Sequence, residues 1–184
     1  MVRLVVILAL CLTFAGCGDS VSRRKSAAAE LQALSAAFRT NPDDATPLNL
    51  IIDVLENGKY RFNRTYACGE LRELGPLAKP AVPALVRALN CGDNYVEREA
   101  PRSLGAMGED ARDAVPALIE KLRNSNRDSS WFSAEALGAI GEPALVAIPD
   151  LEIAASGDSG LLVEYAENAL KRLRKIQQLR GTAE

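Results

Sequence analysis

Few side chains in this sequence could do acid–base or nucleophilic chemistry. Histidine is absent from all 184 residues, which excludes a Ser-His-Asp triad, a Cys-His pair and imidazole ligands for a metal ion. The carboxylate pairs Glu70/Glu73 and Glu97/Glu99 have the spacing of exposed helix residues, and nothing about them suggests a general acid. The glycines do not form a phosphate-binding loop. We therefore expect neither an enzyme nor a cofactor.

The sequence contains four cysteines, which could carry metal, redox or lipid chemistry. Cys11 and Cys17 lie in or beside an N-terminal apolar segment, so a four-cysteine metal site is excluded. If the chain turns between two helices near Leu77, Cys68 and Cys91 are offset by ~7.5 Å along helices ~9 Å apart. A disulfide needs Cα atoms within about 7 Å. We expect two free thiols; a disulfide, which export would favour, is the alternative.

The N-terminus has the features of an export signal. After Arg3, the uncharged stretch from Leu4 to Gly16 has the size of a signal-peptide core and is too short to span a bilayer. Its end, Phe14-Ala15-Gly16-Cys17, resembles the lipobox of bacterial lipoproteins. The resemblance implies a signal peptide over residues 1–16, acylation of Cys17, and anchoring to the bacterial cell membrane or outer membrane. An ordinary cleaved signal and an uncleaved anchor are the alternatives.

Residues 17–26 are polar and lack helical periodicity, and we interpret them as a tether between lipid and folded domain. Arg23, Arg24 and Lys25 could contact anionic headgroups; solvated tether residues are the alternative. Over the whole chain the formal net charge is −2, with both signs interspersed. This balance argues against nucleic acid as a partner.

The remaining sequence repeats with a period of 33 residues. Windows 71–92, 104–125 and 137–158 align without gaps, since 104 − 71 = 33 and 137 − 104 = 33. A fixed period of this size is typical of a solenoid, in which helical hairpins stack on one another. The columns that are identical in all three windows are Leu71/Leu104/Leu137, Gly75/Gly108/Gly141, Ala78/Ala111/Ala144, Ala81/Ala114/Ala147, Pro83/Pro116/Pro149 and Leu85/Leu118/Leu151.

Each window has the pattern of two helices joined by a tight turn. Gly75 directly follows an apolar helix end, where a left-handed residue costs least as glycine. Pro83 stands near the start of the next helix, where its missing amide hydrogen would have no acceptor. Val82, Leu85 and Leu89 then recur at helical spacing and form one apolar face. A hairpin cannot bury this face alone, so we expect neighbouring hairpins to cover it.

The flanking segments match the repeat loosely, as terminal repeats do. Residues 26–39 should form a first helix that ends before Asn41-Pro42, and Thr46 to Glu56 its partner. Near the C-terminus, Arg174 replaces the repeat glycine, so one long amphipathic helix should cap the array. Its apolar face would comprise Leu162, Ala166, Leu170, Leu173 and Ile176.

A first helix that closes on Ala136-Leu137-Gly138-Ala139-Ile140-Gly141 and a second that begins Ala114-Val115-Pro116-Ala117-Leu118 resemble HEAT repeats, especially the HEAT-like repeats of phycobilin lyase subunits. The resemblance covers residues 27–180 and is strongest over 63–156. It implies an all-α solenoid of about four to five hairpins, with the second helices lining the inner face of a curved stack. It implies no catalytic residue.

If the second helices line a groove, the residues beside their apolar faces are binding candidates: Arg87, Glu120, Lys121 and Asp150. A solvated surface is the alternative. Trp131 is a further candidate, because tryptophan is enriched at binding hot spots; packing against the loop of the preceding repeat is the alternative.

Together these features predict a membrane-tethered HEAT-repeat lipoprotein that acts as a protein–protein interaction module in the cell envelope, with an unidentified protein partner. An enzyme or enzyme subunit related to the phycobilin lyases is one alternative, which the missing histidine, the short array and the export signal oppose. A purely structural envelope spacer is the other.

Overall fold

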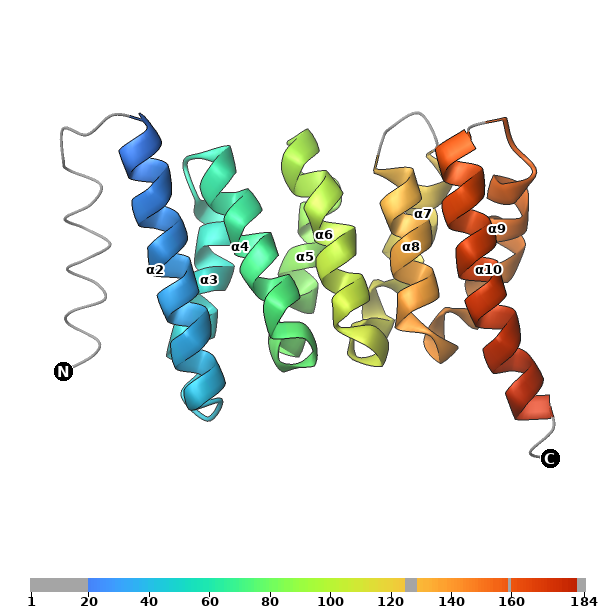
Figure 1. Cartoon of the computed structure of the whole chain (residues 1–184), viewed down its shortest axis with the longest axis horizontal. Coiled ribbons are helices and arrows are strands. Elements are labelled where there is room, and N and C mark those ends of the chain that lie inside the picture. Colours follow the sequence, from blue (N-terminus) through green and yellow to red (C-terminus); the bar gives the residue numbers. More distant parts are fainter. Residues whose placement is uncertain (1–19, 125–128, 159, 182–184) are drawn as a thin grey trace.

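The computed structural model describes residues 20–124, 129–158 and 160–181, and these residues form helices arranged in two rows (Figure 1). The first helix of each hairpin lies in one row: α2 (Ser20–Thr40), α4 (Arg61–Leu74), α6 (Asn94–Ala106), α8 (Ser130–Ile140) and α10 (Gly160–Gly181). The second helices form the other row: α3 (Thr46–Asn57), α5 (Val82–Ala88), α7 (Val115–Arg123) and α9 (Ile148–Ala155). The predicted all-α solenoid of helical hairpins is confirmed.

The three repeat glycines occupy equivalent bends. Gly75, Gly108 and Gly141 have backbone φ angles of 56°, 58° and 81°, values that side-chain-bearing residues rarely adopt. Each stands where a first helix meets the short 3-10 helix that leads into its partner. These connecting helices are η1 (Gly75–Ala81), η2 (Gly108–Ala114) and η3 (Glu142–Ala147). The constant 33-residue stride of the sequence is therefore the stride of the structure.

The repeat columns supply the centre of the core. The leucines at 71, 104 and 137 on first helices, and at 85, 118 and 151 on second helices, are fully buried. The repeat alanines at 78, 81, 111, 114, 144 and 147 are equally inaccessible. A buried leucine side chain contributes roughly 1.5–3 kcal/mol, whereas the alanines allow neighbouring backbones to approach closely.

The array begins with the α2/α3 hairpin, and in the described residues it ends with the single helix α10. Helix α10 buries Leu162, Ala166, Leu170 and Leu173 as predicted, with Ile176 packed beside them. Helix α2, in contrast, begins at Ser20. Residues 20–26, which the sequence predicts to be part of the polar tether, are therefore helical. No glycine or proline interrupts residues 20–40. Among the described residues, no helix is long and apolar enough to cross a bilayer.

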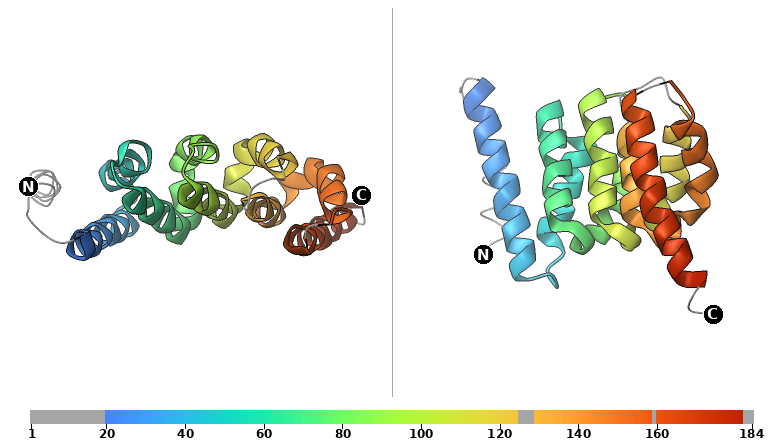
Figure 2. Two further views of the ribbon diagram at one scale, coloured as in Figure 1. Left: turned by 90° about the horizontal axis from the view of Figure 1, so that it is seen from above. Right: turned by 45° about the vertical axis from the view of Figure 1, so that its right-hand side comes forward.

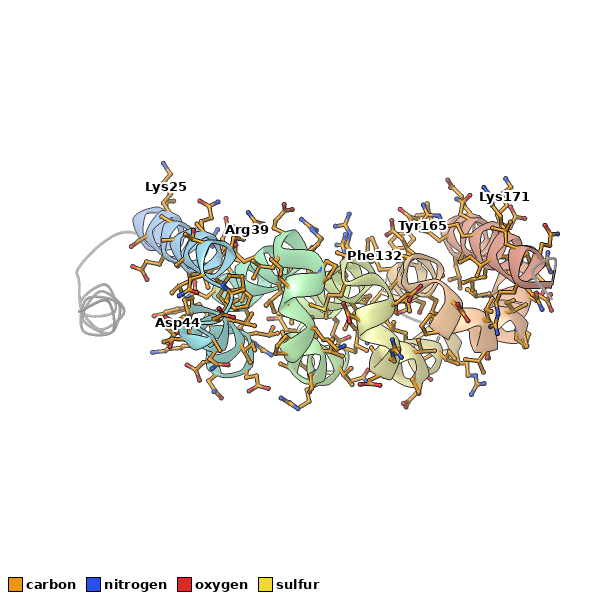
Figure 3. The ribbon with its side chains drawn as sticks, turned by 90° about the horizontal axis from the view of Figure 1, so that it is seen from below. Lys25, Arg39, Asp44, Phe132, Tyr165 and Lys171 are labelled. Carbon is orange, nitrogen blue, oxygen red and sulfur yellow. The ribbon has the colours of Figure 1, made fainter. Side chains whose placement is uncertain are left out.

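The row of first helices lies on the shallow concave side of the array. Seen from above and from below, α2 and α10 at the ends stand forward of α6 in the middle (Figures 2 and 3). In the same views the row of second helices lies on the convex side. The expectation that second helices line the inner face is therefore wrong for this chain.

Glycines in the first helices allow these helices to pack closely. A Cβ atom at Gly105 of α6 would lie 3.1 Å from the Cα atom of Ala136 on α8. A Cβ atom at Gly138 of α8 would lie 2.8 Å from the Cα atom of Ala169 on α10. Real Cβ atoms essentially never show the distance at Gly138 and rarely show the one at Gly105, so glycine at these places allows the small helix separation.

Candidate interaction surface

The exposed side of the second helices carries Arg87 and Glu120, with Asp150 half-buried beside them. Arg87 on α5 forms an ion pair with Glu56 on α3. Asp150 on α9 accepts hydrogen bonds of 2.6 and 3.1 Å from Arg123 at the end of α7, and this contact raises the pKa of Arg123. Both ion pairs link neighbouring second helices. The structure therefore gives two of the predicted groove residues a role in joining repeats.

Lys121 is not a groove residue, because the structure buries it. Its side chain is 3% exposed, and its Nζ lies 2.7 Å from Oε2 of Glu97, which is 2% exposed. Lys121 also donates to the carbonyl of Leu89 at 2.6 Å and to Oδ1 of Asn90 at 3.3 Å. Glu97 accepts from the backbone N–H of Gly92 at 2.8 Å. The predictions that Lys121 lines a groove and that Glu97 is exposed are both wrong.

Lys121 is buried because it contacts the preceding repeat, and the apolar pattern of a single helix does not reveal such a contact. Lys121 precedes the buried Leu122 on α7 and faces the segment that joins α5 to α6. Glu97 reaches the same place from α6. The charges are compensated inside the protein, since each side chain meets several polar partners.

Trp131 belongs to the first-helix side, at the start of α8. Its ring centroid lies 5.6 Å from that of Phe132 and 6.2 Å from that of Tyr165 on α10. Its Nε1 is buried without a hydrogen-bond acceptor. Trp131 thus packs against the following first helix, α10. The predicted contact with the preceding loop falls on residues 125–128, which lie outside the described residues.

Arginines stacked on aromatic rings cross the first-helix row. In each contact the arginine comes from one first helix and the ring from the next, so the contacts connect α2, α4, α6 and α8 in order; Tyr165 on α10 continues the row 6.2 Å from the Phe132 ring. Figure 3 shows Phe132 and Tyr165 on this side of the array. We call this set the arginine–aromatic ladder: Arg24 over Phe62 at 5.1 Å, Arg61 over Tyr95 at 5.2 Å, and Arg98 and Arg102 over Phe132 at 5.6 and 4.9 Å.

Two pairs of rings in the ladder have the 33-residue spacing of the core columns, but the step between the pairs, from Tyr95 to Phe132, is 37 residues (132 − 95 = 37), so the pairs occupy different columns of the repeat. Tyr95 stands 33 residues after Phe62, and Tyr165 stands 33 residues after Phe132 (95 − 62 = 33; 165 − 132 = 33). Extending the alignment upstream of Leu71 reveals the first pair, and the second appears only when the last helix is aligned as a further repeat. Their partners could not be foreseen, because each ring meets an arginine from a different repeat.

The chemistry of this face suits binding. Aromatic residues and arginine are the types enriched at protein interfaces, and an arginine over a ring contributes roughly 0.5–1 kcal/mol at an exposed site. Tyr95 is 53% exposed, and Arg98 and Arg102 are also exposed. The first-helix row therefore presents side chains with the composition of an interface.

Cys68 and Cys91 are free thiols, as expected. Burial raises the pKa of the Cys68 thiol to about 12, and the nearby Glu99 carboxylate acts in the same direction. Because the thiolate is the reactive form, Cys68 is inert at neutral pH. In the described ranges, no group of three or more Cys, Asp or Glu side chains is arranged to hold a metal ion.

Stacked helical hairpins with a glycine bend at a constant stride define the class of this protein, an α-solenoid. Within that class, the family model for HEAT repeats matches residues 82–171. The matched range contains the second and third sequence windows complete. These observations support a HEAT-like repeat protein.

Solved structures agree on the fold. Two crystal structures of engineered proteins are similar to this chain. The first has a TM-score of 0.64 at 20% sequence identity, with 94% of this chain and 80% of that chain covered. The second has a TM-score of 0.62 at 21% identity, with 92% of this chain but only 47% of that chain covered. No curated protein matches.

Proposed function

We propose that this protein is a membrane-tethered protein–protein interaction module of the cell envelope, without catalytic activity. The observation that carries the proposal is the arginine–aromatic ladder, which runs across one broad face of a rigid array. Stacked repeats hold such a surface in one shape, so a partner can be bound with little loss of conformational entropy on this side.

The tether part of the proposal is supported by sequence. Residues 1–19 lie outside the described residues, and the segment that ends at Cys17 is similar to a lipoprotein signal. An acyl chain stabilises membrane attachment by ~0.8 kcal/mol per buried methylene, so several chains on one cysteine give a lasting anchor.

We place the partner site at the C-terminal half of the ladder, where the aromatic rings are most concentrated. The site, which we call the aromatic cluster, takes residues from α6, α8 and α10. Arg98 and Arg102 are exposed and provide charge and hydrogen bonds, and the half-buried rings of Trp131 and Tyr165 provide apolar contact area at low entropic cost. Phe132 is only 7% exposed and supports the two arginines from beneath. The residues of the cluster are Arg98, Arg102, Trp131, Phe132 and Tyr165.

Photo-crosslinking in intact cells tests this placement. A crosslinking residue at Glu135, one helical turn from Trp131 on α8, should form an adduct with a partner; the same residue at Glu120 on α7 should not. The adduct should be lost in the Arg98→Glu/Arg102→Glu variant and retained in Arg87→Glu. Adducts at Glu120 instead would make the placement wrong. No adduct at either site would favour a structural spacer.

Mass spectrometry of the membrane-bound protein tests the tether directly. We expect a mature chain that begins at an acylated Cys17, and loss of membrane attachment in Cys17→Ser. A chain that is cleaved at another residue, or that carries no acyl group, would contradict this part of the proposal.

A further inference from the structure

A lipid at Cys17 would hold one edge of the array close to the membrane. This step rests on the proposed tether. Ser20 starts α2 only three residues after Cys17, so the helix begins within about 11 Å of the acylated residue. Figure 1 shows that α2 starts on the long edge where α4, α6, α8 and α10 also start. We call this the starting edge, and the opposite edge, with the three glycine bends, the turn edge.

The half of the starting edge nearest the tether is basic and aromatic. Its residues come from α2, from the start of α4 and from the start of α6. Arg61 lies 5.2 Å from the Tyr95 ring centroid, and Lys59 lies 5.7 Å from that of Tyr60. In Figure 3, Lys25 projects from α2 away from the row of second helices. The residues of this basic edge are Arg24, Lys25, Lys59, Tyr60, Arg61 and Tyr95.

The carboxylates beside this patch are already engaged: Glu56 at the end of α3 pairs with Arg87, and Asp53 accepts a hydrogen bond of 2.7 Å from Asn57. Asp93 caps α6, and its Oδ1 accepts a hydrogen bond of 3.0 Å from the backbone N–H of Tyr95. The turn edge carries both signs of charge. Its acidic residues are Asp43, Asp44, Glu73, Glu109, Asp110, Asp113 and Glu142, and its basic residues include Arg39, Arg72, Lys79, Arg112 and Arg180, the last of which pairs with Glu142 at 2.8 Å.

We propose that the basic edge rests on an anionic lipid surface, so that the array stands on the membrane with its turn edge outward. Lysine and arginine are attracted to anionic headgroups, and tyrosine favours the membrane interface. Helix α4 has 14 residues and is therefore about 21 Å long. That length exceeds two Debye lengths at physiological salt, about 8 Å each, so repulsion between the headgroups and the carboxylates of the turn edge is screened.

This orientation leaves the aromatic cluster accessible. The cluster lies on the later repeats, away from the tether. It is on the first-helix side of the array, which stands upright on the membrane in this orientation (Figure 3). A partner embedded in or resting on the same membrane could then reach it. The lipid thus sets the distance of the array from the membrane, and the basic edge sets the orientation of the array on it.

Vesicle binding by the unacylated chain tests the edge apart from the tether. A chain that starts at Gly18 keeps the whole core, because the core residues lie between Leu31 and Leu173. It should co-sediment with phosphatidylcholine vesicles that contain phosphatidylglycerol, and not with phosphatidylcholine alone. Each basic contact is worth about fivefold in binding. The variant Lys25→Glu/Lys59→Glu/Arg61→Glu should therefore lose more than ~100-fold.

The matched control reverses the same number of charges on the turn edge, as Arg39→Glu/Lys79→Glu/Arg112→Glu, and should bind like the parent. Equal losses in both variants, or no preference for anionic vesicles, would overturn the proposal. Loss with Lys25→Glu alone, but not with Lys59→Glu/Arg61→Glu, would mean that α2 contacts the membrane end-on, which also contradicts it. Acylation of Cys17 is measured separately, so failure of the tether and failure of the edge give different results.

Discussion

At the scale of single residues, ion pairs in this protein differ by burial. The Lys121–Glu97 pair is enclosed where the α5–α6 connection meets α7, whereas the Arg87–Glu56 pair lies in solvent. Water screens an exposed pair and leaves it weak. A buried pair cannot lose one partner without stranding the other charge in the interior.

We predict that Glu97→Ala lowers the free energy of unfolding by about 3–5 kcal/mol, because it leaves the Lys121 ammonium buried and unpaired. Glu56→Ala, which breaks the exposed pair, should cost less than about 1 kcal/mol. Urea denaturation followed by circular dichroism measures both. The double variant Glu97→Leu/Lys121→Met should recover most of the loss; a double variant as unstable as Glu97→Ala would contradict the explanation.

A second prediction concerns the Cys68 thiol, whose pKa is about 12 in the folded protein against 9.0 for the unperturbed group. In the chain from Gly18, an alkylating reagent at pH 8 should modify Cys91 only; both thiols should react after unfolding. The unfolded thiol ionises first as the pH rises, so Cys68 contributes stability that is complete below pH 9 and is lost as the pH rises towards 12. Cys68→Ala should reduce this decline. Rapid native labelling of two thiols would contradict the prediction.

At the scale of elements, small residues control how closely first helices approach. Gly138 lies against Ala169, where a Cβ atom would meet backbone, but a Cβ atom at Gly69 on α4 would have no neighbouring atom within 4 Å. The same substitution should therefore have opposite effects at these two helical glycines.

We predict that Gly138→Ala destabilises the fold by about 1–3 kcal/mol, because α8 and α10 must move apart. Gly69→Ala should stabilise it by up to about 1 kcal/mol through helix propensity. Thermal unfolding measures the difference. A stabilised Gly138→Ala variant would mean that the contact between α8 and α10 is looser than the structure indicates.

At the scale of the whole molecule, the ends decide whether a stack of hairpins is soluble. Helix α10 covers α8 and α9 and presents Lys171, Arg172, Arg174 and Lys175 to solvent. A repeat array needs such a polar end, since each inner hairpin is apolar on both sides.

We predict that a chain ending at Asp158, without α10, loses cooperative unfolding and self-associates, because the side of α8 that carries Trp131 and Gly138 loses its cover. Gel filtration and binding of a hydrophobic dye measure this result. The variant Lys171→Ala/Lys175→Ala changes only exposed residues and should remain monomeric if the parent is. A soluble, cooperatively unfolding truncated chain would show that α10 is dispensable.

The sequence by itself determined the hairpin, its period and its core. Leu71, Gly75, Pro83 and Leu85 each act within one repeat, through helix periodicity, a left-handed bend and a helix start. Such local preferences can be read from neighbouring positions along the chain. The capping role of the last helix was readable for the same reason.

Only the tertiary structure decided which face is concave, where Lys121 points and which arginine meets which ring. Each of these depends on residues from two repeats, such as Gly138 with Ala169 or Arg61 with Tyr95. The pattern of apolar residues along one helix shows which of its sides is buried. It does not show how close the neighbouring helix lies or which charged residues that helix carries. The surface that this protein offers is therefore a product of stacking, because stacking alone brings those side chains together.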